Sequence, residues 1–403
     1  MSFLMIILFF CSIHLSANEI VNCSINPYEN VNWSVWEQYK ANFHTHTILS
    51  GGTFTPAEVI DNYYIKDYRI LSITDHNLIT WPWADYGRDP DSLGMLAVKG
   101  DEYSNSLHVN AFFNFSRDTA TMKEGIPHID SLAGLSHINH PGRTKTPEEW
   151  PWYIPWYQNY QSCVGLEVFN KGDLYPNDRK LWDNINENLF NSDSMFVWGF
   201  SNDDMHTEGN LYHNFQFMLM PSLSQENLKT CMDEGAFYFC YEITGSGAAN
   251  VPRINSIDVD DEAKTISIEA ADYDSIKWIG PGTIVFGSGE VFQYSDYFNK
   301  NFIRAVLYGP EGSTYSQPFG FKTVSTTISP AIPSNINTVV SGDSMIISWD
   351  ISENAESYDI YSSNDPEGIF TFEANVIENQ FIVTVSEAKK FYYIIGKNDT
   401  KSK

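Results

Sequence analysis

Two histidines one residue apart, His44 and His46, stand in the segment NFHTHTILSGGTFTP (residues 42–56), at the end of a short apolar stretch. On an extended strand, residues i and i+2 face the same side, so the two imidazoles can approach one metal ion. A pair of this kind is weak evidence by itself, because exposed or core-packed histidine pairs also occur by chance. The positions of the other histidines decide between these interpretations.

Nine of the ten histidines lie between residues 44 and 213, and most of them stand where a predicted strand ends. Acidic residues occur at the same places, and together the candidates are Asp75, His76, Glu102, His108, His137, His140, Glu167, Asp204 and His206. In a parallel barrel the carboxyl ends of the strands meet at one mouth, so we expect these groups to form one cluster. Several imidazoles with two or three carboxylates suit two or three divalent transition ions better than one.

The elements that must position this cluster are expected between residues 39 and 243. The stretch TPAEVIDNYYIKD predicts a helix, with Thr55 as N-cap, Pro56 at the first position and Glu58 closing a capping box. Apolar stretches of strand length alternate with helical ones, and they are YRILSIT, GMLAVKG, HVNAFFNF, GLSHINH, VGLEVFN, MFVWGFS and NFQFMLM. Continuous apolar strands separated by helices predict a parallel, barrel-like α/β core.

Two smaller all-β modules are expected to follow this α/β core. Beyond a linker at 243–250 the helical pattern disappears, and residues 251–325 predict a small β-sandwich with recurrent turn signals. Residues 330–403 resemble a fibronectin type III module, with Trp349 on one predicted strand and Tyr358 on the next. Every candidate ligand precedes the linker, so residues 251–403 are expected to be dispensable for chemistry.

The net charge and the N-terminal segment indicate which partners and which location to expect for the protein. A net charge of -27 would repel nucleic acids and anionic membranes, so we expect no extended nucleic-acid surface. Residues 1–17 contain an apolar run that predicts a signal peptide, with an uncleaved anchor as the alternative, and no later segment is apolar enough to span a membrane. The protein is therefore expected to be secreted, periplasmic or at the cell surface, and its protein partners are unknown.

The series of motifs resembles the polymerase and histidinol phosphatase (PHP) family of metal-dependent phosphoesterases. The matching stretches, in the family's order, are HTH, ITDHN, DEYSNSLH, NHPGR, GLEVFN and DMH. The resemblance implies a distorted (β/α)7 barrel that binds two or three Mn, Fe or Zn ions. It implies that His44, His46, Glu102 and Asp204 bind one ion, that Glu102 bridges to a second ion held also by His108 and His140, and that His76 and His206 hold a third.

The third site departs from the family pattern. Gly51 stands where many members carry an acidic residue or a histidine that completes this site. The site would then have only two protein ligands unless another group reaches in, and Asp85 and Asp203 are the two candidates. We therefore expect two ions, with the third left open.

Other polar residues near the motifs have more than one interpretation. Asp75 is expected to orient a neighbouring imidazole. Glu167 would support a ligand, touch the substrate or serve hydrogen bonding in the core. His137 is expected to be structural or to support a ligand. Arg143 and Lys171 follow predicted strand ends and are candidates to bind a substrate phosphate, with ordinary surface salt bridges as the alternative.

The resemblance implies an enzyme that hydrolyses a phosphomonoester or phosphodiester through a hydroxide that bridges two metals, with Glu102, Asp204 and His206 as catalytic groups. The substrate would be a small phosphorylated molecule or an oligomeric phosphodiester. One alternative is hydrolysis of a non-phosphate ester or amide on the same metals, because fold does not fix the reaction. Another is a non-catalytic metal-containing binding protein, against which the near-complete ligand set argues.

Overall fold

The computed structural model describes residues 16–114, 121–247, 250–297, 301–328, 330–384 and 390–398. The chain divides into two compact units, one of Val21–Lys322 and one of Thr323–Lys403 with Met1–Ile20. Of the predicted signal peptide, residues 1–15 lie outside the described residues, and strand β1 (Ser16–Ile25) begins directly after them. Within the described ranges, no helix is long and apolar enough to cross a membrane.

A mixed sheet forms the centre of the unit Val21–Lys322. In spatial order its central strands are β10 (Phe237–Glu242), β9 (Asn214–Met220), β2 (Glu37–Asn42), β3 (Ile70–Ile73), β4 (Leu96–Tyr103), β5 (Val109–Phe112), β6 (Leu135–Ile138), β7 (Cys163–Asn170) and β8 (Trp198–Asn202). The pairs β2–β3, β3–β4, β6–β7 and β7–β8 are parallel. The pairs β10–β9, β9–β2, β4–β5 and β5–β6 are antiparallel. The α/β class is confirmed, with a parallel-rich sheet.

The order of hydrogen-bonded strands is open between β8 and β9 within the described part of the chain. Side chains fill this seam. The Ser201 backbone N–H on β8 donates to Gln216 Oε1 on β9 at 3.1 Å. The ring of Phe200 lies 4.7 Å from that of Phe237 on β10. A regular seven-stranded (β/α)7 barrel stays a prediction.

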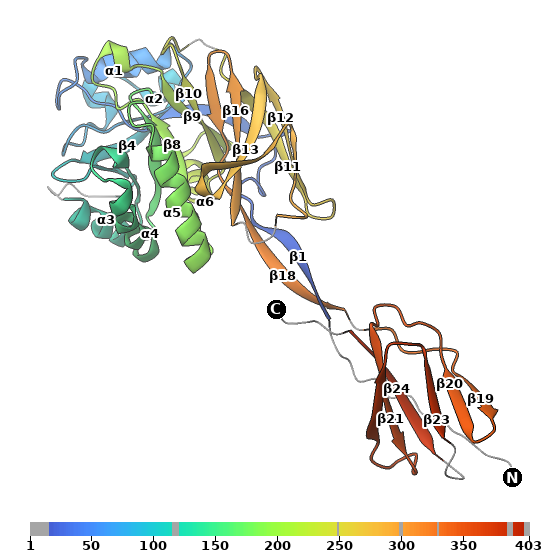
Figure 1. Ribbon diagram of the computed structural model, residues 1–403. Coiled ribbons are helices and arrows are strands. Elements are labelled where there is room, and N and C mark those ends of the chain that lie inside the picture. Colours follow the sequence, from blue (N-terminus) through green and yellow to red (C-terminus); the bar gives the residue numbers. More distant parts are fainter. Residues whose placement is uncertain are drawn as a thin grey trace. The chain divides into compact units, whose positions relative to one another are not determined.

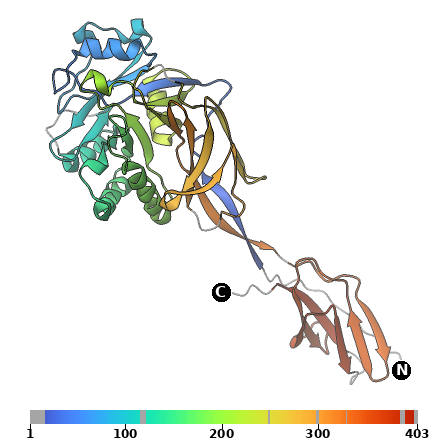
Figure 2. The ribbon, with the colours of Figure 1, turned by 45° about the horizontal axis from the view of Figure 1, so that its top comes forward.

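Helices flank this sheet, and they are α1 (Pro56–Tyr64), α2 (Pro90–Leu93), α3 (Met122–Ser131), α4 (Ile154–Asn159), α5 (Asp178–Asp193) and α6 (Gln225–Glu234). Short 3₁₀ helices occur at η1 (Trp83–Tyr86), η2 (Pro141–Arg143), η3 (Pro147–Tyr153), η4 (Glu208–Asn210) and η5 (Pro281–Thr283). The capping box predicted for α1 is confirmed, because the Glu58 N–H donates to Thr55 Oγ1 at 3.3 Å and the Thr55 N–H donates to Glu58 Oε2 at 2.8 Å. Helices α3, α4 and α5 lie along one side of the unit and β11, β12 and β13 along the other (Figure 1), as the turned view in Figure 2 also shows.

The segment that follows the linker is all-β, and its strands are β11 (Arg253–Asp260), β12 (Thr265–Ala271), β13 (Ser275–Gly280), β14 (Ile284–Ser288), β15 (Val291–Gln293), β16 (Phe302–Gly309), β17 (Gly312–Tyr315) and β18 (Phe319–Ile328). Strand β17 pairs antiparallel with β10, so the segment continues the central sheet. Strands β11, β12 and β15 form a separate three-stranded sheet. Residues 39–243 and the strands up to Lys322 thus belong to one compact unit.

A buried ion pair joins this β segment to helix α5. Arg304 on β16 donates from Nε and Nη2 to both carboxylate oxygens of Asp183, at 2.7 and 2.9 Å. Both side chains are 1% exposed, and the guanidinium lies 5.2 Å from the ring centre of Trp182. A chain cut near Asn250 would remove the counter-ion of Asp183, the strands that cover it and the partner strand of β10. We therefore no longer expect all of residues 251–403 to be dispensable for chemistry. Only the residues beyond β18 are now expected to be dispensable.

The second unit contains two three-stranded antiparallel sheets. One contains β19 (Asn337–Ser341), β20 (Ser344–Ser348) and β23 (Gln380–Thr384), and the other contains β22 (Thr371–Val376), β21 (Ser357–Ser363) and β24 (Phe391–Lys397). Their shared apolar core includes Trp349 and Tyr358, whose ring centres are 5.1 Å apart. The fibronectin type III resemblance stays a prediction.

We predict that Arg304→Ala strongly destabilises the unit Val21–Lys322. Removing one partner of a buried ion pair leaves an uncompensated charge, at a cost of about 3–5 kcal/mol. Thermal unfolding of the full chain measures the effect. The control Arg69→Ala removes an exposed pair with Asp67, 2.6 Å long, and should change the midpoint little. Equal midpoints for the two variants would contradict the role given to Arg304.

Candidate metal centre

The structure gathers all eight predicted ligands at one end of the central sheet. They lie at or next to strand ends, with His44 and His46 after β2, His76 after β3, Glu102 in β4, His108 before β5, His140 after β6, and Asp204 and His206 after β8. Two of these residues turn the chain in left-handed backbone conformations, with φ of 28° at His140 and 44° at Asp204. Such conformations are rare for residues other than glycine and cluster at functional sites.

The Glu102 carboxylate lies at the centre of the cluster and is 1% exposed. From Oε1 the imidazole nitrogens lie at 2.8 Å (His108 Nδ1), 3.2 Å (His44 Nε2) and 3.6 Å (His140 Nε2), and from Oε2 at 2.6 Å (His76 Nδ1) and 3.5 Å (His46 Nε2). Imidazoles therefore approach both oxygens, with His44, His108 and His140 at Oε1 and His46 and His76 at Oε2. A carboxylate that is approached on both oxygens can be shared between two ions.

Asp204 supplies the second carboxylate from the opposite side. Its Oδ1 lies 3.2 Å from His46 Nε2, 3.2 Å from His206 Nδ1 and 3.5 Å from His44 Nε2. The side chains of His44, His46 and Asp204 are buried, whereas His206 is partly exposed. The site is thus closed to solvent at His44, His46 and Asp204 and more open at His206.

The donor atoms of the cluster fit divalent metal ions. His76 Nδ1 and Glu102 Oε2 lie 2.6 Å apart, yet each is buried without a hydrogen-bond partner among the described residues. Three groups each bring three ligand atoms within 4.8 Å of one another: His44, His46 and Glu102; His76, Glu102 and His108; and His46, His76 and His206. Imidazole nitrogens mixed with carboxylate oxygens suit Mn, Fe or Zn.

Hydrogen bonds fix the tautomers of the two histidines of the first motif. His44 Nδ1 lies 2.7 Å from Glu167 Oε1, and a carboxylate can only accept, so this nitrogen carries the proton. Ser50 Oγ donates to Asp75 Oδ1 at 2.5 Å and can therefore accept from His46 Nδ1 at 3.3 Å. Both Nε2 atoms keep a lone pair for an ion. Asp75 thus orients an imidazole through Ser50, and Glu167 orients one directly.

The charges of the cluster balance one another inside the protein. Burial opposes a charge on His44, but Asp204, Glu167 and Glu102 together raise the pKa of His44 well above its usual value. Burial also opposes charge on Glu102, yet His44 and the other imidazoles hold the pKa of Glu102 well below its usual range. A proton on His44 therefore offsets the buried carboxylates, and a bound cation would displace it.

Gly51 adds no side chain to the third site, where His46, His76 and His206 bring three ligand atoms within 4.8 Å of one another. A Cβ placed on Gly51 would lie 3.8 Å from His206 Cδ2, and the φ of 111° at Gly51 disfavours any side chain there. Asp203 does not reach in, because its carboxylate accepts from Tyr63 Oη and from the Tyr212 and Asn214 N–H groups, each at 2.8 Å. Asp85 is exposed on η1, and no described contact brings it to this site.

Two predicted substrate-binding cations differ in position. Lys171 Nζ lies 3.3 Å from Asp204 Oδ2 and so faces the cluster. Arg143 is exposed on η2, beside the tyrosine Tyr175. The ring of Tyr175 lies 6.1 Å from that of His140, and burial raises its pKa while Arg143 opposes the shift. No sequence pattern pointed to Tyr175, which follows the GLEVFN motif without a pattern of its own.

The structure also shows supporting residues that sequence reasoning missed. Asn139 Nδ2 donates to Glu102 Oε1 at 2.8 Å. Asp178, the first residue of α5, is 1% exposed and packs against Gly142 in the loop after His140. A Cβ at Gly142 would lie 2.0 Å from Asp178 Oδ1, so only glycine fits there. His137, in contrast, packs in the core on Phe200 at 4.8 Å.

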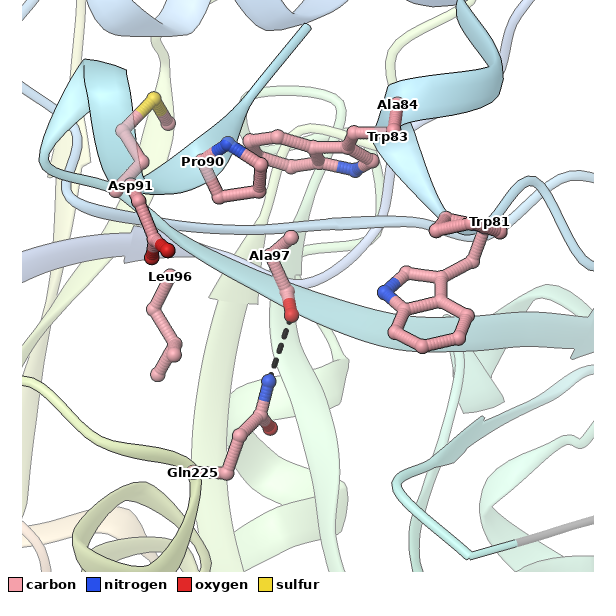
Figure 3. Close-up of a pocket in the computed structure, with 10 residues that line it drawn as sticks. Trp81, Trp83, Ala84, Pro90, Asp91, Leu96, Ala97 and Gln225 are labelled. Atoms are coloured by element: carbon pink, nitrogen blue, oxygen red, sulfur yellow. Dashed lines mark hydrogen bonds between the residues drawn. The ribbon is translucent and has the colours of Figure 1, made fainter.

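A hollow of about 240 Å³ lies away from this cluster (Figure 3). It is lined by Trp81, Pro82, Trp83, Ala84, Pro90, Asp91, Met95, Leu96, Ala97 and Gln225. Gln225 Nε2 donates to the Ala97 carbonyl at 2.7 Å, as Figure 3 shows. It contains none of the predicted ligands, and its aromatic lining consists of Trp81 and Trp83.

Searches against protein families and against curated proteins return no match. Among solved structures, a two-domain protein from Bacteroides vulgatus with a predicted PHP-like metal-dependent phosphoesterase is 16% identical, with a TM-score of 0.45 over 76% of this chain and 98% of the other. An amidohydrolase from Chromobacterium violaceum (14% identity, TM-score 0.34) and a proposed metal-dependent phosphoesterase from Bifidobacterium adolescentis (15%, 0.30) each match 42% of this chain and 88% of their own. At this level of likeness neither a family nor an activity follows.

We predict that the stability of the metal-free protein falls between pH 5 and pH 8 in part because of Asp178. Burial raises the pKa of Asp178 to about 8, whereas an unfolded aspartate titrates near 4. The folded state therefore binds more protons within this window, so stability decreases as pH rises. Asp178→Asn keeps the size of the side chain but cannot ionise, so it should gain stability relative to wild type on going from pH 5 to pH 8.

Unfolding midpoints at the two pH values measure this effect of Asp178. The control Asp193→Asn changes a fully exposed carboxylate, whose pKa is lowered by Gln158, and should show no such gain. An unchanged pH dependence in Asp178→Asn would mean that the buried carboxyl is ionised throughout.

We predict that Glu102→Gln lowers the metal content to less than one ion per chain. The substitution keeps the size of the side chain but removes the charge that both ligand groups share, and an amide nitrogen cannot ligate. Elemental analysis of protein expressed with ample metal measures the result. Glu234→Gln, an exposed change on α6, serves as the control. A full metal content in Glu102→Gln would place the centre of the cluster on another residue.

Proposed function

We propose that this protein is a metal-dependent hydrolase of phosphate esters. One observation carries the proposal: the buried Glu102 carboxylate is shared between two sets of imidazoles at the end of the sheet. The order of the HTH, ITDHN, NHPGR and DMH motifs, which resembles that of PHP phosphoesterases, supports the same function.

The proposed ligands divide into two complete groups and one incomplete group. His44, His46, Glu102 and Asp204 would hold one ion, and Glu102, His108 and His140 a second. His76 and His206 would hold a third only with His46 or with a group from the substrate. Divalent ions bound there supply Lewis acidity toward a phosphoryl oxygen and lower the pKa of an attacking water.

The protein's own cations favour a phosphate over a neutral ester. Lys171 Nζ lies 3.3 Å from Asp204 Oδ2, and Arg143 is exposed in the turn that follows His140. In a chain with a net charge of -27, cations at this place are well suited to hold the oxygens of an anion. The proposed substrate is a small phosphomonoester or an oligomeric phosphodiester. Export of the protein rests on the predicted signal peptide of residues 1–17.

The experiment is a screen of the metal-loaded full chain against phosphomonoesters, phosphodiesters, carboxylic esters and amides. We predict turnover of a phosphate ester, lost on chelation and restored by Mn, Fe or Zn. Lys171→Met should raise the KM for that ester about tenfold or more, because a charge-assisted contact is lost. Lys229→Met, a change on the exposed face of α6, should leave KM unchanged. Turnover of amides or carboxylic esters alone, or none with metal fully bound, would overturn the proposal.

A further inference from the structure

Asn170, the last residue of β7, lies between two carboxylates of the metal centre. Its Nδ2 donates to Glu167 Oε2 at 2.8 Å and to Asp204 Oδ2 at 3.3 Å. Asn170 is 2% exposed, so neither bond competes with bulk water. Both protons of the carboxamide are therefore used on acidic groups.

The orientation of this carboxamide is fixed by chemistry. Asn170 Oδ1 is buried and has no hydrogen-bond partner among the described residues. Turning the group over would place this oxygen against Glu167 and Asp204 and would leave the nitrogen without its two acceptors. Carboxylates accept and do not donate, so the alternative orientation has no favourable contact.

The contacts give the two oxygens of Asp204 different roles. Oδ2 receives Asn170 Nδ2 and Lys171 Nζ, both at 3.3 Å. Oδ1 faces His44, His46 and His206, at 3.2 to 3.5 Å. His140 Nε2 lies 4.0 Å from Oδ2, farther than the other three imidazoles lie from Oδ1. The two protein donors therefore lie at one oxygen, and the closer imidazoles lie at the other.

Glu167 divides its oxygens in a similar way. Oε1 accepts from His44 Nδ1 at 2.7 Å, and Oε2 accepts from the His140 backbone N–H at 2.9 Å as well as from Asn170. Asn170 therefore links Asp204 to Glu167. Glu167 in turn orients the His44 ring and accepts from the backbone N–H of His140. These two histidines belong to different ligand groups.

We propose that Asn170 is a positioning residue, which ties Asp204 to Glu167 so that a single oxygen of Asp204 faces the metal site. The proposal rests on the metal centre described above and not on the identity of the substrate. Supporting hydrogen bonds of this kind typically contribute 10- to 100-fold to metal affinity. Asn170 would thus act on the ligands without touching an ion.

The test compares Asn170→Ala and Asn170→Ser with Asn186→Ala in the full chain. Asn186 is a matched control, because its side chain is 1% exposed and, among the described residues, its carboxamide bonds to the Val197 backbone alone, at 2.8 and 3.2 Å. Co²⁺ is the probe, and its affinity is measured by competition with a chelator. Its visible absorption reports the ligand geometry, and thermal unfolding of the metal-free protein reports stability.

We expect Asn170→Ala to weaken Co²⁺ binding at least about tenfold and to change the absorption spectrum. Asn170→Ser, which keeps one donor, should fall between Ala and wild type and serves if Ala does not fold. Asn186→Ala should lower the unfolding midpoint without changing affinity or spectrum. The positioning role would be overturned if Asn170→Ala kept wild-type affinity and spectrum. It would also be overturned if Asn186→Ala lost as much affinity as Asn170→Ala, and neither result would bear on the metal centre itself. A wild-type protein that binds no Co²⁺ would overturn the metal centre as well, whereas binding without turnover would overturn only the proposed reaction.

Discussion

The burial of three carboxylates at one end of the central sheet governs the structure of this protein. Glu102, Glu167 and Asp204 are at most 4% exposed, and isolated buried charges are very unfavourable. The chain compensates with imidazoles, with amide donors and with a proton on His44, whose pKa is raised by those carboxylates. Such a cluster gains most from divalent cations, because they offset the charge that the fold concentrates there.

Strands beyond the linker also support this cluster. Arg304 on β16 pairs with Asp183 on α5, and the same helix begins at Asp178. Asp178 in turn packs against Gly142 in the loop that follows His140. The β segment therefore reaches a candidate ligand through one helix and two buried contacts. This link gives residues 251–322 a structural role in the metal centre, which a simple division into catalytic and accessory domains would miss.

Much of the site could be predicted from the sequence because its signals are local. The capping box at Thr55 and Glu58 and the histidines and acids next to strand ends are read from short stretches, and the gap at Gly51 follows from the motif. The pairing of β10 with β17 could not be predicted, since it depends on contacts between residues far apart in the chain. Asn170, Asp178 and Tyr175 were missed because an amide, a helix-initiating aspartate and a lone tyrosine have many ordinary roles. The open seam between β8 and β9 likewise depends on side chains such as Gln216.

The proposed function rests on a Glu102 carboxylate that lies between two metal ions. Anomalous X-ray diffraction from crystals of the metal-loaded protein, recorded at the absorption edge of the bound metal, locates such ions. We expect two peaks that flank the Glu102 carboxylate, one beside His44, His46 and Asp204 and one beside His108 and His140. A single peak away from Glu102, or no peak in this cluster after metal-replete preparation, would show that Glu102 does not bridge two ions.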